Sequence, residues 1–177
     1  MNVLDRIRPT PGLEVLITAG ASGIDAASSD AFMAADANFC DIDRGSVEGI
    51  RARRPGSHAT VADIAAAAEA DRSVNGAENA LGGPDVLVNN GGFAGPTGRV
   101  EDLTAVDWQR TITTHLNSQF HFLRRAVRLL KASPTPGIIV MSSVAKRVGS
   151  SFRTDCYATK YAIIGLIEVA RDRARAG

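Results

Sequence analysis

Residue types that mark disulfide-bonded, metal-binding or membrane-spanning proteins are scarce in this sequence. Its 2 cysteines, Cys40 and Cys156, lie far apart and match neither a disulfide framework nor the spacing of a metal site. The longest aliphatic runs, such as 138–141, are far too short to span a bilayer, and the N-terminus lacks the apolar segment of a signal peptide. We therefore expect a cytoplasmic protein without a metal site or a membrane contact.

A large excess of charge of one sign is also absent. Lys and Arg number 20 and Asp and Glu 19, and basic residues gather only in the short clusters 51–54 and 171–175. Since nucleic-acid-binding domains carry a strongly basic face, we expect no nucleic-acid partner. Apolar residues, in contrast, make up 45% of the sequence, which is enough for the core of a single domain covering residues 1–177.

Short apolar runs alternate with longer segments along the chain. The runs at 15–18, 38–41, 59–62, 86–89 and 138–141 have the length and composition of strands. Parallel strands need crossover helices between them, and strands covered on both faces are continuously apolar, as in VLVNN and IIVMSS. The alternation predicts an α/β fold, a Rossmann-type doubly wound parallel sheet with helices on both faces.

One long helix is predicted over residues 104–132. It begins with TAVD, which resembles a capping box, and it ends before the turn formed by Pro134, Pro136 and Gly137. Apolar residues at helical spacing predict that one face of it belongs to the core. These residues are Val106, Ile112, Leu116, Phe120, Leu123 and Val127.

The sequence TAGASGID at 18–25 combines a strand end, a Gly-rich turn and a helix start. Small residues let backbone N–H groups approach a pyrophosphate, and the helix N-terminus adds partial positive charge. The candidate phosphate-site residues are Thr18, Gly20, Ser22 and Gly23. Asp41, about 20 residues further on, closes the second predicted strand, where a carboxylate can bind both ribose hydroxyls of adenosine and repel a 2′-phosphate. This favours NAD over NADP; the alternative is that Asp41 is only a polar residue that ends a strand.

The order of these motifs resembles the short-chain dehydrogenase/reductase family over essentially the whole chain. The family's T-G-x-x-x-G-x-G turn, the acidic end of its second strand, its D-[VI] after the third strand and its N-N-A-G after the fourth all have counterparts. The resemblance implies that Ile24 lies beside the nicotinamide, that Asp63 and Ile64 contact the adenine, and that Asn90 and Gly91 lie near the cofactor ribose.

Two of these motif positions have other interpretations. Asp63 is also suited to be the N-cap of the Ala-rich helix that follows it, and residues 89–92 would form a sensible loop in any protein. The family's first glycine is Ala19 here, which is a mild change if the φ angle of this residue is negative.

The resemblance also implies a catalytic set. In the family a Tyr hydroxyl acts as acid and base, a Lys four residues later lowers the pKa of that Tyr and holds the nicotinamide ribose, and a Ser and an Asn complete the site. Aligned without a gap, RTDCYATK matches the family's R-T-P-Y-A-A-S-K, with Cys156 at the tyrosine and Lys160 at the lysine. Ser143 matches the serine that binds the substrate oxygen, and its spacing to Cys156 is the family's common Ser-to-Tyr spacing. His115 stands at the helix asparagine.

Three of these positions have open interpretations. Tyr157 is the only phenol nearby but is rotated by about 100° from Cys156, so that it either swings back into the site or packs against a neighbouring helix or subunit. Cys156 is either a loss-of-function substitution or a small apolar filler, since its sulfur reaches less far than a phenol oxygen. His115 either relays a proton or is a helix residue with no role.

The leading hypothesis is an NAD-dependent oxidoreductase of the short-chain type, which moves a hydride between nicotinamide and a small-molecule carbonyl or secondary alcohol. The alternatives are a catalytically impaired dinucleotide-binding family member and a truncated fragment, because the chain ends at Gly177, before the last strands of the family fold. The resemblance also implies a homo-oligomer that assembles through the long helices at 104–132 and 157–175.

Overall fold

The computed structural model describes residues 9–20, 23–35, 38–43, 47–53, 55–143 and 152–175. In these ranges β1 (Glu14–Thr18), β2 (Asn38–Asp43), β3 (His58–Val61), β4 (Val86–Asn89) and β5 (Gly137–Val140) form one parallel sheet in the order β3-β2-β1-β4-β5. The helices are α1 (Gly23–Met33), α2 (Glu48–Arg53), α3 (Ala67–Leu81), α4 (Ala105–Thr111), α5 (Ser118–Leu130) and α6 (Thr154–Arg175). A 3-10 turn, η2 (Val100–Asp102), and a π-helical segment, η3 (Ile112–Asn117), complete them. The predicted parallel α/β sheet is confirmed.

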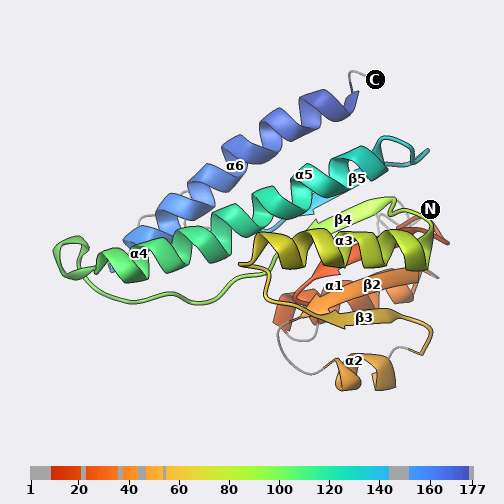
Figure 1. The fold of residues 1–177 in the computed structure, drawn as a ribbon, viewed down its shortest axis with the longest axis horizontal. Coiled ribbons are helices and arrows are strands. Elements are labelled where there is room, and N and C mark those ends of the chain that lie inside the picture. The colour runs from red at the N-terminus through yellow and green to blue at the C-terminus, as the bar shows by residue number, and fades with distance from the viewer. Residues whose placement is uncertain are drawn as a thin grey trace, which may run out of the picture.

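Helices cover both faces of the sheet, as predicted (Figure 1). Side chains alternate along a strand, so neighbouring residues of β1 face opposite layers. Leu16 of β1 and Leu87 of β4 pack with α3 and α5, whereas Val15 and Ile17 belong to a second cluster with Phe32 of α1. Each fully buried aliphatic side chain of this kind contributes about 1.5–3 kcal/mol. This two-sided core explains why the central runs of β1 and β4 are continuously apolar.

The segments α4, η3 and α5 follow one another without a break and form the predicted long helix (Figure 1). Its N-cap is confirmed, because the Thr104 side chain accepts a hydrogen bond from the Asp107 backbone N–H at 3.1 Å. The predicted core face is wrong at Val106, which is 77% exposed, and at Phe120, which is 47% exposed. The π-helical segment has a wider turn than an α-helix, so a pattern of 3.6 residues per turn does not hold across it. The buried residues are Thr111, His115, Ser118, Gln119, Phe122, Leu123, Ala126 and Leu130.

Helix α6 lies alongside this long helix (Figure 1) and is joined to it by buried polar contacts. Asp155, which is 1% exposed, accepts a hydrogen bond from the Thr111 hydroxyl at 2.5 Å. One turn further along α6, the Thr159 hydroxyl lies 3.2 Å from His115 Nδ1. These contacts fix both the rotation and the height of α6 relative to the π-helical segment.

The strand order determines where a ligand site can form. From β1 the chain proceeds outward to β2 and β3 and then returns to place β4 on the other side of β1. In open α/β sheets the crevice at such a reversal, beside the carboxyl ends of the strands, is the usual ligand site. The ends of β1 and β4 are therefore the first place to look for function.

The described ranges lack membrane-spanning helices and metal-binding clusters. They contain no helix that is both long and apolar enough to cross a membrane. They also contain no group of three or more His, Cys, Asp or Glu side chains that could hold a metal ion.

Candidate active site

The side chain of Thr18 joins the ends of β1 and β4. Thr18 is the last residue of β1 and is 0% exposed. Its Oγ1 accepts hydrogen bonds from the backbone N–H groups of Asn90 at 3.0 Å and Gly91 at 3.1 Å, and it donates to Asn89 Oδ1 at 3.4 Å. Thr18, a predicted phosphate-site residue, therefore holds the start of the loop after β4 in place through its side chain.

The turn after β1 holds a residue in the left-handed region at the first glycine position of the motif. Ala19 has a φ of 66°, where an L-residue is disfavoured by about 1–2 kcal/mol. The condition under which Ala19 would be a mild change, a negative φ, is therefore not met, and the turn keeps a backbone path that favours glycine. Gly23 has a φ of 60°, and its missing Cβ faces open space. Gly20 is buried, and Ser22 lies outside the described residues.

A cleft of about 520 Å³ opens at the carboxyl ends of β1 and β4. It is lined by the turn after β1, the loop after β4, the π-helical segment and the first turns of α6. The lining residues are Ala19, Gly23, Ile24, Asn90, Gly92, Phe93, Ala94, His115, Arg153, Cys156 and Lys160. The fold thus gathers predicted site residues from four separate segments at the strand reversal.

Cys156 and not Tyr157 lines this cleft. Cys156 and Lys160 lie one turn apart on α6 and both line the cleft, whereas Tyr157 is partly buried and is not among the lining residues. The Lys160 ammonium donates a hydrogen bond to the Met141 carbonyl, just beyond β5, at 2.7 Å. Ser143 follows nearby in the chain, is partly buried and is likewise not a lining residue. This geometry agrees with the gap-free alignment of the α6 motif.

His115 is held on both sides of its ring. It is 2% exposed, its Nε2 lies 2.8 Å from the Phe93 carbonyl oxygen and 3.2 Å from the Phe93 amide nitrogen, and its Nδ1 contacts Thr159. Burial lowers the pKa of His115 below 6.5, and the hydrogen bond to the Phe93 carbonyl opposes this in part. The neutral ring can carry its proton on Nε2, donating to the carbonyl, or on Nδ1, donating to Thr159 while Nε2 accepts from the amide. In the second tautomer the Phe93 amide keeps its acceptor, and Thr159 accepts from the ring while its own hydroxyl donates to the Cys156 carbonyl at 2.8 Å. The ring also lines the cleft.

The turn after β3 packs against the loop after β4, where Ile64 lies beside Gly91. Asp63 Oδ1 accepts a hydrogen bond from the Ala65 backbone N–H at 3.1 Å. The N-cap residue of α3 is Ala66, so the alternative that Asp63 caps this helix is wrong. Ile64 packs against the core, and a Cβ on Gly91 would lie 2.2 Å from Ile64 Cδ1. A larger residue at this place would require the end of the Ile64 side chain to move.

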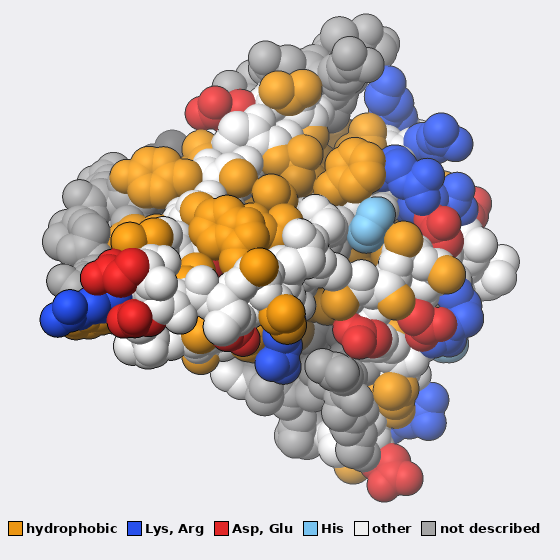
Figure 2. All heavy atoms as spheres, turned by 60° about the vertical axis from the view of Figure 1, so that its left-hand side comes forward, with side chains coloured by type: hydrophobic (Ala, Val, Ile, Leu, Met, Phe, Trp, Pro, Cys, Tyr) orange, Lys and Arg blue, Asp and Glu red, His pale blue; other side chains and the backbone are white. Residues whose placement is uncertain are grey.

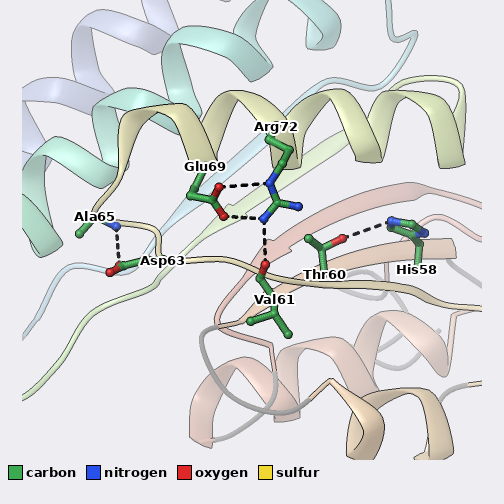
Figure 3. A network of polar contacts seen from close by, with 7 residues as sticks. All are labelled: His58, Thr60, Val61, Asp63, Ala65, Glu69 and Arg72. Atoms are coloured by element: carbon green, nitrogen blue, oxygen red, sulfur yellow. Dashed lines mark hydrogen bonds and ion pairs between the residues drawn. The ribbon is translucent and has the colours of Figure 1, made fainter.

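The edge strand β3 is anchored beside that turn. Arg72 of α3 donates to the carbonyl of Val61, the last residue of β3, at 2.9 Å, and it pairs with Glu69 at 2.5 Å (Figure 3). An exposed ion pair of this kind contributes little by itself. The bond to Val61 nevertheless satisfies a carbonyl at the sheet edge and sets the point where the turn begins.

A larger cavity of about 680 Å³ lies between the turn after β3 and the long helix. It includes Asp63 but neither Lys160 nor Cys156. Its lining residues are Asp63, Ala65, Ala105, Val106, Gln109, Arg110, Thr113 and Thr114. Because the lysine, the thiol and the imidazole converge in the smaller cleft, we assign the candidate active site there.

Strand β2 is two residues longer than predicted. Asp41 pairs with Ile17 and Ala59 in the sheet and does not close the strand, which ends at Asp43. The prediction that Asp41 ends the strand is therefore wrong. Asp43 occupies that place and was missed, although Ile42 between two acidic residues was a signal that the strand continues.

Sequence reasoning also missed two residues of the cleft. The ring of Phe93 meets the His115 ring edge-on with 5.3 Å between centroids, and the Arg110 guanidinium lies 4.8 Å from its centre. Arg153 donates from Nη1 to the Ala94 carbonyl. Phe93 follows the loop after β4 and Arg153 is the first residue of the aligned RTDCYATK motif, but the contacts of both side chains depend on the tertiary fold.

The Gly-rich turn, the strand reversal and the lysine on α6 together define a dinucleotide-binding type of α/β protein. The sequence pattern of the short chain dehydrogenase family matches residues 14–176. The chain is 32% identical over 175 residues to a D-beta-hydroxybutyrate dehydrogenase of Cupriavidus necator, covering 94% of this chain and 67% of the relative. Other curated relatives extend further beyond the match: the chain covers 55% of general stress protein 39 of Bacillus subtilis.

Solved structures share the fold. A levodione reductase matches with a TM-score of 0.85 and 24% identity, covering 94% of this chain and 69% of that one. An NADPH-bound short chain oxidoreductase from Pseudomonas aeruginosa PAO1, described as containing an atypical catalytic center, matches with a TM-score of 0.82 and 22% identity, covering 90% and 65%. The protein belongs to the short-chain dehydrogenase family of oxidoreductases.

Proposed function

We propose that the protein is an NAD-dependent oxidoreductase that moves a hydride between nicotinamide and a small-molecule carbonyl or secondary alcohol. The observation that carries this proposal is the cleft at the strand reversal, which joins the Gly-rich turn after β1, the loop after β4 and Lys160 of α6. Relatives named as dehydrogenases support the reaction class.

The residues of the cleft fit a dinucleotide. The open space at the missing Cβ of Gly23 gives a phosphate access to backbone, and the exposed Ile24, with 64% of its surface accessible, provides an apolar surface for a flat ring. Lys160, whose ammonium is positioned by the Met141 carbonyl, is placed to donate to ribose hydroxyls. Bound NAD would supply or accept the hydride, while the chain's own residues bind the cofactor, orient the substrate and move the proton.

The residues available for proton transfer differ most from the family pattern. Cys156 lines the cleft where the family has its phenol, and its thiol is the group best placed to exchange a proton with a substrate oxygen. Tyr157 and Ser143 remain proposed partners for that oxygen. The absence of Tyr157 from the described cleft lining specifically favours a second candidate function, a dinucleotide-binding family member with impaired turnover.

Thermal unfolding of the purified chain with saturating NADH or NADPH tests the cofactor. Ligand at about 100 times its Kd adds roughly 2.7 kcal/mol, or about 5–10 °C in Tm for a domain of this size. We expect NADH to raise Tm and NADPH to raise it less, and the double variant Asp41→Ala, Asp43→Ala to lose this discrimination. An unshifted transition with both nucleotides would refute the proposal.

Turnover of the Cys156→Tyr variant separates the two candidate functions. If the chain is an impaired dehydrogenase, Cys156→Tyr raises the rate of NADH oxidation with a panel of carbonyl compounds at least tenfold. The matched control is Tyr157→Phe, which abolishes wild-type turnover if Tyr157 donates the proton and leaves it unchanged otherwise. If neither the wild type nor Cys156→Tyr turns over while both still bind NADH, the result supports the second candidate, a dinucleotide-binding family member with impaired turnover.

We also propose that the chain forms homo-oligomers through its long helices. Exposed apolar side chains support this, including Val106, Trp108 and Phe120 on the α4 to α5 helix and Tyr161 and Val169 on α6. Figure 2 shows hydrophobic side chains gathered on the side of the molecule where these helices lie. Sedimentation velocity measures the state directly, and a purely monomeric chain at micromolar concentration contradicts this proposal. The cytoplasmic location stays a prediction.

A further inference from the structure

The charged residues that line the cleft all have one sign. Among the described lining residues the only charged groups are Arg153 and Lys160, both cations, and no Asp or Glu is present. The remaining wall near them is apolar or neutral, with Phe93 and Ala94 from the loop after β4. A small apolar body with one negative group matches this surface, because a single-sign cleft concentrates ligands of the opposite charge.

Arg153 is held in place but not saturated. Its Nη1 donates to the Ala94 carbonyl, and its other guanidinium donors have no partner among the residues that the structure describes. The side chain is partly exposed. A guanidinium that is fixed on one side keeps its planar fork ready for a carboxylate and loses less conformational freedom on binding.

The position of Arg153 relates it to the reacting end of the cleft. It directly precedes α6, and Cys156 lies about one helical turn further on. The Gly-rich turn after β1 is the expected place for cofactor phosphates. Arg110 contacts the outer side of the Phe93 ring and lines the larger cavity instead.

We propose that Arg153 binds the carboxylate of the substrate, which makes the substrate class a short hydroxy acid or keto acid. This inference rests on the proposed function for the position of the reacting oxygen, but it concerns a different contact from those that hold the cofactor. A bidentate Arg–carboxylate pair supplies both affinity and orientation.

The experiment compares 3-hydroxybutanoate with 3-hydroxybutanamide, which have nearly the same shape but differ in charge. Calorimetric titration of the full chain is carried out with and without saturating NADH, a combination in which an alcohol substrate cannot react. We expect wild type to bind the acid about tenfold more tightly than the amide, which corresponds to about 1.4 kcal/mol. Arg153→Gln brings the ratio of the two affinities, acid to amide, to about one. Arg153→Lys gives an intermediate ratio because it keeps the charge and loses the planar guanidinium.

Arg99→Gln is the matched control, since Arg99 lies in the same connecting segment as Phe93, is 68% exposed and is not a lining residue of the cleft. It should leave the acid-to-amide ratio unchanged. A wild-type ratio near one overturns the inference without any variant, and so does a ratio that survives Arg153→Gln. Loss of the NADH-induced Tm shift in Arg153→Gln also overturns it, because Arg153 would then bind a cofactor phosphate.

The two proposals fail in different ways. If NADH raises Tm and the ratio is near one, the oxidoreductase proposal stands and the substrate class is wrong. If NADH has no effect and the acid is still preferred in an Arg153-dependent manner, the anion site is real and the cofactor proposal is wrong.

Discussion

Replacing Ala19 by glycine should stabilise the protein, which is unusual for a change that removes a methyl group. Ala19 has a φ of 66°, in the region that costs an L-residue about 1–2 kcal/mol. Glycine removes that cost but adds unfolded-state entropy worth about 0.4–1 kcal/mol. The difference is a gain of about 0.5–1 kcal/mol, or about 1–4 °C in Tm.

Urea unfolding followed by circular dichroism measures this gain. Ala80→Gly is the matched control, because Ala80 is exposed in the last turn of α3, where the same substitution costs up to about 1 kcal/mol. We expect the two variants to change stability in opposite directions. If Ala19→Gly destabilises the protein as much as Ala80→Gly, the left-handed conformation of Ala19 is refuted.

Three further predictions concern buried polar groups. Gln119→Met should stabilise the protein by about 1 kcal/mol in urea unfolding, since both side-chain amide atoms of Gln119 are buried without a partner among the described residues; a loss of similar size would contradict this. Thr18→Val should cost about 2–3 kcal/mol because it orphans two buried backbone N–H groups, whereas the control Thr60→Val, at a more exposed site, should cost under about 0.5 kcal/mol. Burial lowers the pKa of His115 in the folded state, so below pH 6.5 the unfolded state binds a proton that the folded state excludes. The free energy of unfolding of the wild type should therefore decrease as the pH is lowered through that range. His115→Asn should show a smaller decrease between pH 7.5 and 5.5.

The sheet could be predicted from the sequence because its signals are local. The two central strands β1 and β4 contain short, continuously apolar runs, and parallel strands buried on both faces require that composition. The end of β2 was misjudged because Asp41 is polar, and polarity alone does not show where backbone pairing with β1 and β3 stops. The rotation of the long helix could not be predicted, because nothing local in ITTHLN announces a π-helical turn.

The site was predictable where function depends on backbone motifs and unpredictable where it depends on tertiary contacts. The positions of Gly23, Asn90 and Lys160 follow from the turn after β1, the end of β4 and the α6 motif, and all three line the cleft. The role of Thr18 as a support of the β4 loop requires knowledge that β1 and β4 are neighbours. Arg153 begins the same α6 motif, but its contact with the Ala94 carbonyl arises because α6 docks beside the loop after β4, which the sequence does not show.

The contacts that anchor α6 explain how a cysteine can occupy the position aligned with the family's tyrosine without loss of the fold. Helix α6 is held by Asp155 and Thr159, which contact the long helix, and by the Lys160 carbonyl, which accepts a hydrogen bond from Ser142 at 3.0 Å. These anchors flank Cys156, and none of them uses its side chain. The residue at this position can therefore change while α6 keeps its place, so a tyrosine restored here enters an intact helix and its effect on turnover reports on proton transfer and not on folding.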